Sequence, residues 1–232
     1  MWQFSDRLAR SITLLRWVGY GLLIFFGLDT IETLTPLRFT NPAWEFQTMG
    51  TIIEQIAVPL IGLALIFFGE LNLRSPGEIF LVKTLSWLTL LGAIVMFLLI
   101  PLGIVNTVRI ERQSNEQITS QLNQQLAQIQ QVKEQLTKAT TKEEMQALVG
   151  RLDTQGRAPE IENSEQLGQI KLQLSDFIEQ SENTIKAQTQ TIQKDRRLTL
   201  LKSSFKWNIG ALISGVLFAL LWQGTHWARR KS

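Results

Sequence analysis

The stretch LTLLGAIVMFLLIPLGIV, residues 88–105, carries no charge and runs directly into a polar segment at 106–206. A helix needs about 20 mainly apolar residues to cross the hydrocarbon of a bilayer, so this stretch predicts a membrane span over 81–105. The polar segment holds 18 glutamines among its 101 positions. An apolar stretch at 207–224 follows it. Both ends of the polar segment therefore return to the same face of the membrane.

Two further apolar stretches come earlier in the chain, at 12–28 and 52–69. Helices that stay apolar on every side for this length are typical of membrane spans, and buried helices of a soluble protein are the less favoured interpretation. We expect an all-α integral membrane protein with four transmembrane helices. Its expected regions are a three-helix part at 1–105, a polar helical hairpin at 106–206, and a fourth span with a basic tail at 207–232.

Tryptophan and small residues mark the expected spans. Trp44 precedes the second span, Trp207 begins the fourth, and Trp222 and Trp227 close it. Because indole rings favour the membrane–water interface, these four residues are expected interface anchors. The fourth span also repeats small residues every four positions, which lets another helix approach closely. Those residues are Ala211, Gly215 and Ala219. Their neighbour is either another span of this chain, the favoured interpretation, or a partner subunit.

Basic residues set the expected orientation. With a cytoplasmic N-terminus, the short cytoplasmic segments hold seven basic residues and the loop at 29–51 holds one, Arg38. The seven are Arg7, Arg10, Arg74, Lys83, Arg229, Arg230 and Lys231. The positive-inside rule then places both termini in the cytoplasm. Basic residues of 106–206 near the membrane favour the reverse, but long segments cross largely regardless of charge, so we expect this segment outside.

An apolar heptad repeat runs through the first half of the polar segment. One of its positions holds Val108, Asn115, Leu122, Ile129 and Leu136, and the companion position holds Ile118, Gln125 and Val132. The second half has a stripe at Leu167, Ile170, Leu174, Phe177 and Ile178, which thins to Ile185 and Ile192. The pattern predicts an antiparallel helical hairpin resembling a coiled-coil stalk. The alternative is a partly disordered polar segment.

Capping signals subdivide this hairpin. Thr141 with Glu144 predicts a capping box for a short helix through Val149, and Asn163 with Gln166 predicts another before the return helix. Between them, the glycines and the proline of 150–159 predict the distal turn.

The return half of the hairpin has a weak core between Glu179 and Lys194, where Ile185 and Ile192 are the only large apolar residues. A seam that is deficient within one chain is commonly completed by another. We therefore expect this section, represented by Glu179, Ile185, Ile192 and Lys194, to bind another membrane or extrinsic protein or a second copy of the chain.

Residues and motifs typical of enzymes are few. Cysteine is absent and His226 is the only histidine, so neither a thiolate site nor a metal site is expected. Arg16 and Glu54 are expected to reach lipid headgroups, although ionisable groups inside a membrane also suggest a transporter. Pro59 and Pro101 are expected to kink their spans. The near balance of charge in 106–206 argues against nucleic acid. We expect no enzymatic activity and no cofactor.

The sequence LRFTNPAWEF at 37–46, followed by GTIIEQIAVPLIGLAL at 50–65, resembles HpsJ-like cyanobacterial membrane proteins. The resemblance implies a multi-pass protein of the plasma or thylakoid membrane, linked to hormogonium polysaccharide production or export. It implies no catalytic residue. A non-enzymatic scaffold or accessory subunit is the interpretation that fits both the resemblance and the residues. The alternatives are a subunit or assembly factor of a photosynthetic membrane complex and, less favoured, a transporter.

Overall fold

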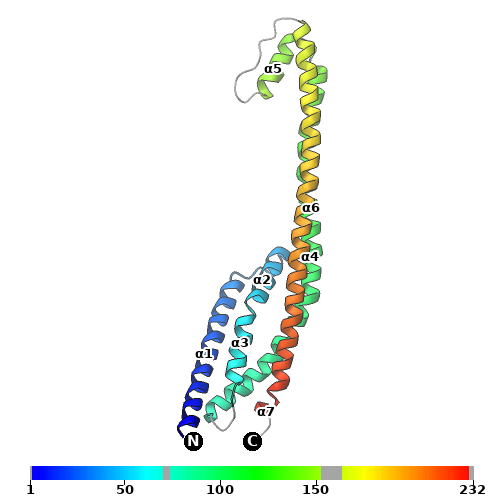
Figure 1. Ribbon diagram of the computed structural model, residues 1–232. Helices are drawn as coiled ribbons and strands as arrows, with labels where there is room; N and C mark the ends of the chain where they lie inside the picture. The colour runs from blue at the N-terminus through cyan, green and yellow to red at the C-terminus, as the bar shows by residue number, and fades with distance from the viewer. Residues whose placement is uncertain (1, 70–73, 153–163, 230–232) are drawn as a thin grey trace. The chain divides into compact units, whose positions relative to one another are not determined.

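The computed structural model describes residues 2–69, 74–152 and 164–229, and the regular structure in these ranges is entirely α-helical (Figure 1). The helices are α1 (Trp2–Leu34), α2 (Pro42–Gln55), α3 (Ala57–Phe67), α4 (Pro76–Lys138), α5 (Lys142–Leu152), α6 (Ser164–Gly224) and α7 (His226–Arg229). Four stretches are long and apolar enough to cross a membrane: Ser11–Leu34, Pro42–Phe67, Pro76–Lys138 and Glu165–Gly224. The expected all-α class with four candidate spans is confirmed.

The chain forms two compact units. The first unit comprises Met1–Glu111 and Thr199–Ser232, and the second comprises Arg112–Leu198. Helices α4 and α6 contribute residues to both units. The sequence had predicted the limits of the polar segment at 106 and 206.

In the first unit, α1 and α3 pack through two glycines. A Cβ added to Gly19 would lie 2.6 Å from the carbonyl oxygen of Gly62, and one added to Gly62 would lie 3.0 Å from the carbonyl oxygen of Gly19. Helix backbones approach this closely only where side chains are absent. The Gly19–Gly62 contact therefore sets the crossing of α1 over α3, which Figure 1 shows side by side.

The second candidate span is broken, and the loop before it is shorter than predicted. Helix α1 continues to Leu34 and α2 begins at Pro42, so the loop expected at 29–51 is confined to 35–41. The break falls at Ile56, between α2 and α3. Pro59 explains its place, because a proline cannot donate a hydrogen bond to the carbonyl four residues earlier. Pro101, in contrast, lies inside the continuous helix α4.

The core of the first unit is shared by α2, α3, α4 and α6. Its buried members are Phe46, Met49, Ile53, Ile56, Leu63, Ala93, Met96, Ala211 and Phe218. The small-residue stripe of α6 contributes Ala211 to this core, and a Cβ on Gly215 would lie 3.1 Å from the ring of Phe97 in α4. The small residues of α6 therefore pack against other helices of the same chain. This is one of the two alternatives that the sequence left open, the other being a partner subunit.

Buried hydroxyl pairs join α4 to α6, and to the turn that directly follows α6, at two levels of the first unit. Ser86 Oγ and Thr225 Oγ1 lie 2.7 Å apart, and the Thr107 hydroxyl donates to Ser204 Oγ at 2.9 Å. A buried hydroxyl is costly without a hydrogen-bond partner. These pairs therefore favour one register of α4 against α6.

The second unit has a separate apolar core, formed by α4, α5 and α6. Its buried members are Leu136, Ala139, Met145, Leu148, Val149 and Ile178. The Lys171 ammonium donates to the carbonyl oxygens of Thr137 and Ala139 at 3.3 and 3.2 Å. Towards the other limit of this unit, the Arg196 guanidinium donates to Ser114 Oγ at 3.2 Å. Within the second unit, the early residues of α6 therefore contact the late residues of α4, and later residues of α6 contact earlier residues of α4.

The predicted capping box at α5 is confirmed. The Glu144 carboxylate accepts hydrogen bonds from the backbone N–H groups of Thr140 and Thr141, and the Thr141 hydroxyl accepts one from the backbone N–H of Glu144. Helix α5 ends at Leu152 rather than Val149, so Gly150 is helical and not the start of a turn. Residues 151 and 152 of the predicted distal turn are also helical, whereas its remainder at 153–159 and the predicted cap at Asn163 lie outside the described residues.

The heptad repeat predicted for α4 is wrong at several positions. Val108 is 60% exposed, and Asn115 and Gln125 are also exposed. The covered face of α4 instead follows Ile118, Leu122, Leu126, Ile129, Val132 and Leu136. Successive residues of this face lie four or three residues apart, in no fixed order. The face therefore follows the period of an ordinary α-helix, about 3.6 residues, rather than a strict seven-residue repeat.

Candidate functional site

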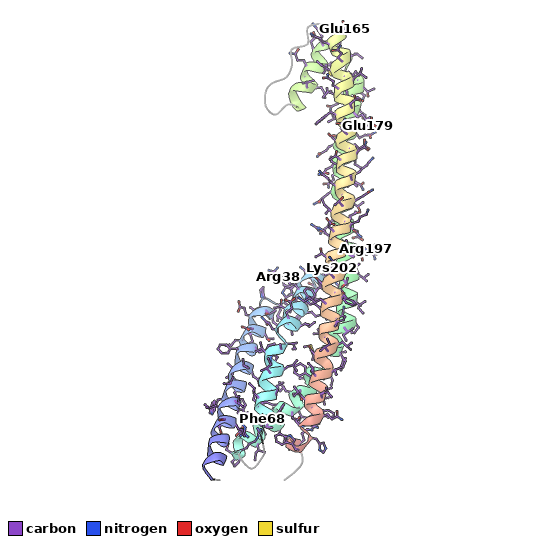
Figure 2. All side chains as sticks on the ribbon, viewed as in Figure 1. Arg38, Phe68, Glu165, Glu179, Arg197 and Lys202 are labelled. Carbon is purple, nitrogen blue, oxygen red and sulfur yellow. The ribbon has the colours of Figure 1, made fainter. Side chains whose placement is uncertain are left out.

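The section of α6 from Glu179 to Lys194 lies in the second unit, where the side chain of Glu179 is labelled in Figure 2. Glu179 and Lys194 are exposed, and Ile185 is half-buried. Ile192 is 48% exposed, so it does not serve as a core residue of this chain. The sequence had placed Ile192 in the seam.

Polar residues take the inward positions of this section. Ser181, Thr189 and Gln193 are half-buried, together with Ile185. Glu182 forms an ion pair with Lys186 on the same helix. Apolar contact with α4 is therefore thin along this part of α6, as the sequence indicated.

A groove of about 340 Å³, called the Phe177 groove below, adjoins this section between α4 and α6 within the second unit. Its lining residues are Gln125, Gln128, Ile129, Val132, Phe177, Ile178, Ser181 and Ile185. The ring of Phe177 is 66% exposed, whereas the adjacent Ile178 is only 7% exposed. Sequence reasoning put both residues into one core stripe and did not recognise the groove. A large apolar residue at an exposed helical position is the feature that distinguishes Phe177.

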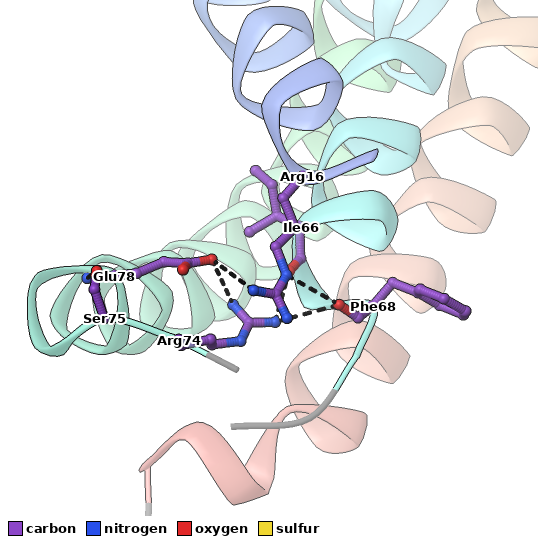
Figure 3. Close-up of polar contacts among 6 residues, drawn as sticks. All are labelled: Arg16, Ile66, Phe68, Arg74, Ser75 and Glu78. Atoms are coloured by element: carbon purple, nitrogen blue, oxygen red, sulfur yellow. Dashed lines mark hydrogen bonds and ion pairs between the residues drawn. The ribbon is translucent and has the colours of Figure 1, made fainter. Parts of the chain in front are cut away.

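Three charged residues from three parts of the first unit meet near the end of α3 (Figure 3). Arg16 of α1 and Arg74 each form an ion pair with Glu78 of α4, at 3.3 and 3.5 Å. Arg16 is only 4% exposed and also donates to the carbonyl oxygen of Phe68 at 3.4 Å. The expectation that Arg16 reaches lipid headgroups is therefore wrong, because the side chain is used within the protein.

Arg74 closes the same end of α3. Its guanidinium donates to the carbonyl oxygen of Ile66 at 2.8 Å and lies 5.3 Å from the ring centroid of Trp227. Burial lowers the pKa of Arg74, and the neighbouring charge of Arg16 lowers it further. Arginine still keeps its charge at physiological pH. This cluster ties α1, α3 and α4 together and is poorly suited to proton transfer.

Glu54 is paired at the other end of the first unit. Its carboxylate accepts hydrogen bonds from the Lys206 ammonium at 2.6 Å and from the Trp207 indole N–H at 3.1 Å. The Trp207 ring packs edge-on against Phe46 with centroids 4.5 Å apart. The expectation that Glu54 reaches headgroups is thus corrected, since α6 supplies its partners.

The other predicted interface tryptophans are half-buried and have aromatic or cationic neighbours. Arg229 lies 4.5 Å from the ring centroid of Trp222, and Phe39 packs edge-on against Trp44 at 5.7 Å. His226 is exposed on α7. In the described ranges, no group of three or more His, Cys, Asp or Glu residues could hold a metal ion.

Comparison with protein families identifies the chain. The family model described as HpsJ-like protein matches residues 10–226. The chain belongs to the HpsJ-like family. The match spans most of the sequence, so the resemblance recognised at 37–46 and 50–65 is confirmed and extends through the polar segment. Comparisons with curated proteins and with solved structures give no match.

Two surfaces of this HpsJ-like protein differ in character. The charged clusters of the first unit are occupied by contacts within the chain. The Phe177 groove and the exposed Ile192 leave apolar surface of the second unit uncovered. Exposed apolar surface beside a polar rim is typical of a protein-binding site, so the second unit holds the candidate functional site.

Proposed function

We propose that this HpsJ-like protein is a non-enzymatic membrane scaffold or accessory subunit. Its four spans hold it in the bilayer with both termini in the cytoplasm. Its polar segment forms an antiparallel helical hairpin outside, which binds another protein. The family name links this role to hormogonium polysaccharide production, so the proposed setting is a cyanobacterial polysaccharide assembly or export apparatus.

The Phe177 groove is the observation that carries this proposal. It lies beside the thin contact between α4 and α6, and Ile192 continues the uncovered apolar surface along α6. An amphipathic helix binds by laying apolar side chains into a groove of this kind. The proposed occupant is a helix of a polysaccharide assembly or export component, which covers Phe177 and replaces the apolar contacts that Thr189 and Gln193 cannot supply.

Site-specific photocrosslinking in native membranes tests this function. A photoreactive phenylalanine analogue is placed at position 177 or 192 of the full-length chain, and the crosslinked protein is identified by mass spectrometry. Position 175 is the matched control, because Ser175 is also exposed on α6 but lies about 160° around the helix from Phe177. We expect crosslinks to a glycosyltransferase or an export component from 177 and 192, and none from 175.

Other outcomes discriminate among the alternatives. A photosystem or electron-transfer subunit captured at 177 would replace the polysaccharide setting with the photosynthetic one. A crosslink to a second copy of the chain would make the groove a self-association site. Equal capture from 175 and 177, or no capture at 177 and at 192, would contradict the scaffold proposal.

A further inference from the structure

A polar cavity of about 500 Å³ lies in the first unit, between the last turns of α1 and one side of α2. Its lining residues are Asp29, Glu32, Thr33, Trp44, Gln47, Thr48, Thr51 and Gln55. Figure 2 marks this end of the unit by Arg38, in the loop between the two helices. Binding sites for small molecules have volumes of about 300–1,000 Å³, so the cavity is large enough to hold one.

The chain holds Trp44 in place at the start of α2. Asn41 caps the helix, and its side-chain oxygen accepts hydrogen bonds from the backbone N–H groups of Ala43 and Trp44 at 3.0 and 3.3 Å. The ring of Phe39 packs edge-on against that of Trp44, with the planes at 87°. Because its backbone and its ring are both supported, Trp44 can present an aromatic surface without a large ordering cost on binding.

The cavity is rich in hydrogen-bond acceptors. The Thr33 hydroxyl donates to the Asp29 carbonyl oxygen at 2.8 Å, and the Thr51 hydroxyl donates to the Gln47 carbonyl oxygen at 3.1 Å. Each hydroxyl has then used its one proton, so its oxygen can only accept a further bond.

Further acceptors of the lining include the side-chain oxygens of Asp29, Glu32 and Gln55. Ionised carboxylates only accept hydrogen bonds. The side-chain oxygen of Gln55 is buried and has no hydrogen-bond partner among the residues that the structure describes. Such an oxygen is satisfied by a ligand that brings a donor.

The lining also selects against several ligand classes. Among the described residues, no lysine or arginine lines the cavity, and two carboxylates do, so phosphates and acidic sugars are disfavoured. Lipid chains are disfavoured because seven of its eight lining residues are carboxylates, amides or hydroxyl residues. Asp29 and Glu32 are exposed, so water screens their attraction for a simple organic cation. A small cation would also leave most of the lining polar groups without a partner.

We propose that this cavity binds a neutral saccharide unit. Sugar hydroxyl groups donate to the carboxylates and to Gln55, and they accept from the amide of Gln47. An apolar C–H face of the sugar ring packs on Trp44. The cavity thus adds a ligand to the proposed function without depending on the protein partner of the second unit. Each of the two can therefore fail separately.

Saturation-transfer difference NMR on the full-length protein in lipid nanodiscs tests the proposal. The probes are glucose and maltose as neutral sugars, glucuronate as an acidic sugar, and spermidine as an organic cation. We expect transfer to the neutral sugars and none to glucuronate. Glu32→Gln is expected to raise the Kd for maltose about two- to tenfold, because it weakens a hydrogen bond at an exposed side chain, where the net contribution is modest. Trp44→Phe is expected to raise the Kd by at least as much, because a smaller ring covers less of the sugar face.

Two control variants outside the cavity test whether a loss of maltose binding is specific to the cavity residues. Trp87→Phe removes an exposed indole of α4, and Glu143→Gln removes an exposed carboxylate of α5. Both are expected to leave maltose binding unchanged, with the same helical content as the cavity variants. The proposal is overturned by absent transfer to neutral sugars, by binding that Trp44→Phe and Glu32→Gln leave intact, or by tighter binding of spermidine than of maltose. Loss of maltose binding with retained crosslinking at 177 would affect this inference alone.

Discussion

Gly19 and Gly62 bring the backbones of α1 and α3 together, since a Cβ on Gly19 would lie 2.6 Å from the carbonyl oxygen of Gly62. The same Cβ would lie 3.2 Å from the backbone nitrogen of Ile66. Backbone atoms cannot move aside as a flexible side chain can. The contact therefore tolerates no side chain on α1 at this point.

Gly19→Ala is expected to destabilise the first unit by about 1–3 kcal/mol, because overpacking forces the two helices apart. Gly21→Ala is the control, because a Cβ on Gly21 meets nothing within 4 Å. The free energy of unfolding is measured by titration with a denaturing detergent. Equal stability of the two variants would show that α1 and α3 do not cross at Gly19.

Glu78→Gln is expected to cost about 3 kcal/mol or more of unfolding free energy, because it leaves the charges of Arg16 and Arg74 less well compensated at a buried site. Glu54→Gln breaks an ion pair whose carboxylate and ammonium side chains are 49% and 67% exposed. Exposed pairs contribute about 1 kcal/mol or less, so this variant should remain close to the parent protein. A smaller loss in Glu78→Gln than in Glu54→Gln would contradict the structural role of the Arg16–Arg74–Glu78 cluster.

Phe177→Ala and Ile178→Ala should have different effects on the free energy of unfolding of the second unit, although the two residues are adjacent. Ile178 is 7% exposed, so its truncation leaves a cavity and costs about 2–5 kcal/mol in the second unit. Phe177 is 66% exposed, and its truncation should change the free energy of unfolding by about 0.5 kcal/mol or less. Hydrogen exchange of α4 and α6 amides measures both. Similar losses of protection would mean that Phe177 belongs to the core.

The stability of α5 should decrease at acid pH, because the carboxylate of Glu144 caps this helix. Hydrogen bonds from the backbone N–H groups of Thr140 and Thr141 lower the pKa of Glu144 below its ordinary value. The folded form therefore prefers the ionised carboxylate. Its contribution to stability is complete above the ordinary glutamate pKa of about 4.3 and is lost as the pH falls through the lower pKa of the folded state.

Hydrogen exchange of α5 amides, corrected for intrinsic exchange rates, measures this effect. Protection in the parent protein should decrease as the pH falls below about 4. Glu144→Gln should have weaker protection at neutral pH and should lose this acid-dependent part. An identical pH response in the two proteins would exclude Glu144 as its source.

Local chemistry explains which sequence predictions agree with the structure. The capping box of α5 joins Thr141 to Glu144, three residues away, so the sequence alone contains the whole interaction. The apolar stretches likewise contain their own signal of length and composition. The seam of the second unit was harder to predict. Phe177 and Ile178 are equally apolar, and only their directions around α6 separate an exposed residue from a buried one.

Residues close together in the chain account for the helical class, the four apolar stretches and the cap at Thr141, so each of these features could be predicted from the sequence. Tertiary structure alone decided that Arg16 meets Glu78 and that Asp29 and Trp44 line one cavity. Arg16 and Glu78 are 62 residues apart. Helix packing brings such residues together, and the rotation of each helix about its axis decides which side chains face one another. That rotation depends on contacts such as Gly19 with Gly62, which no single stretch of sequence contains.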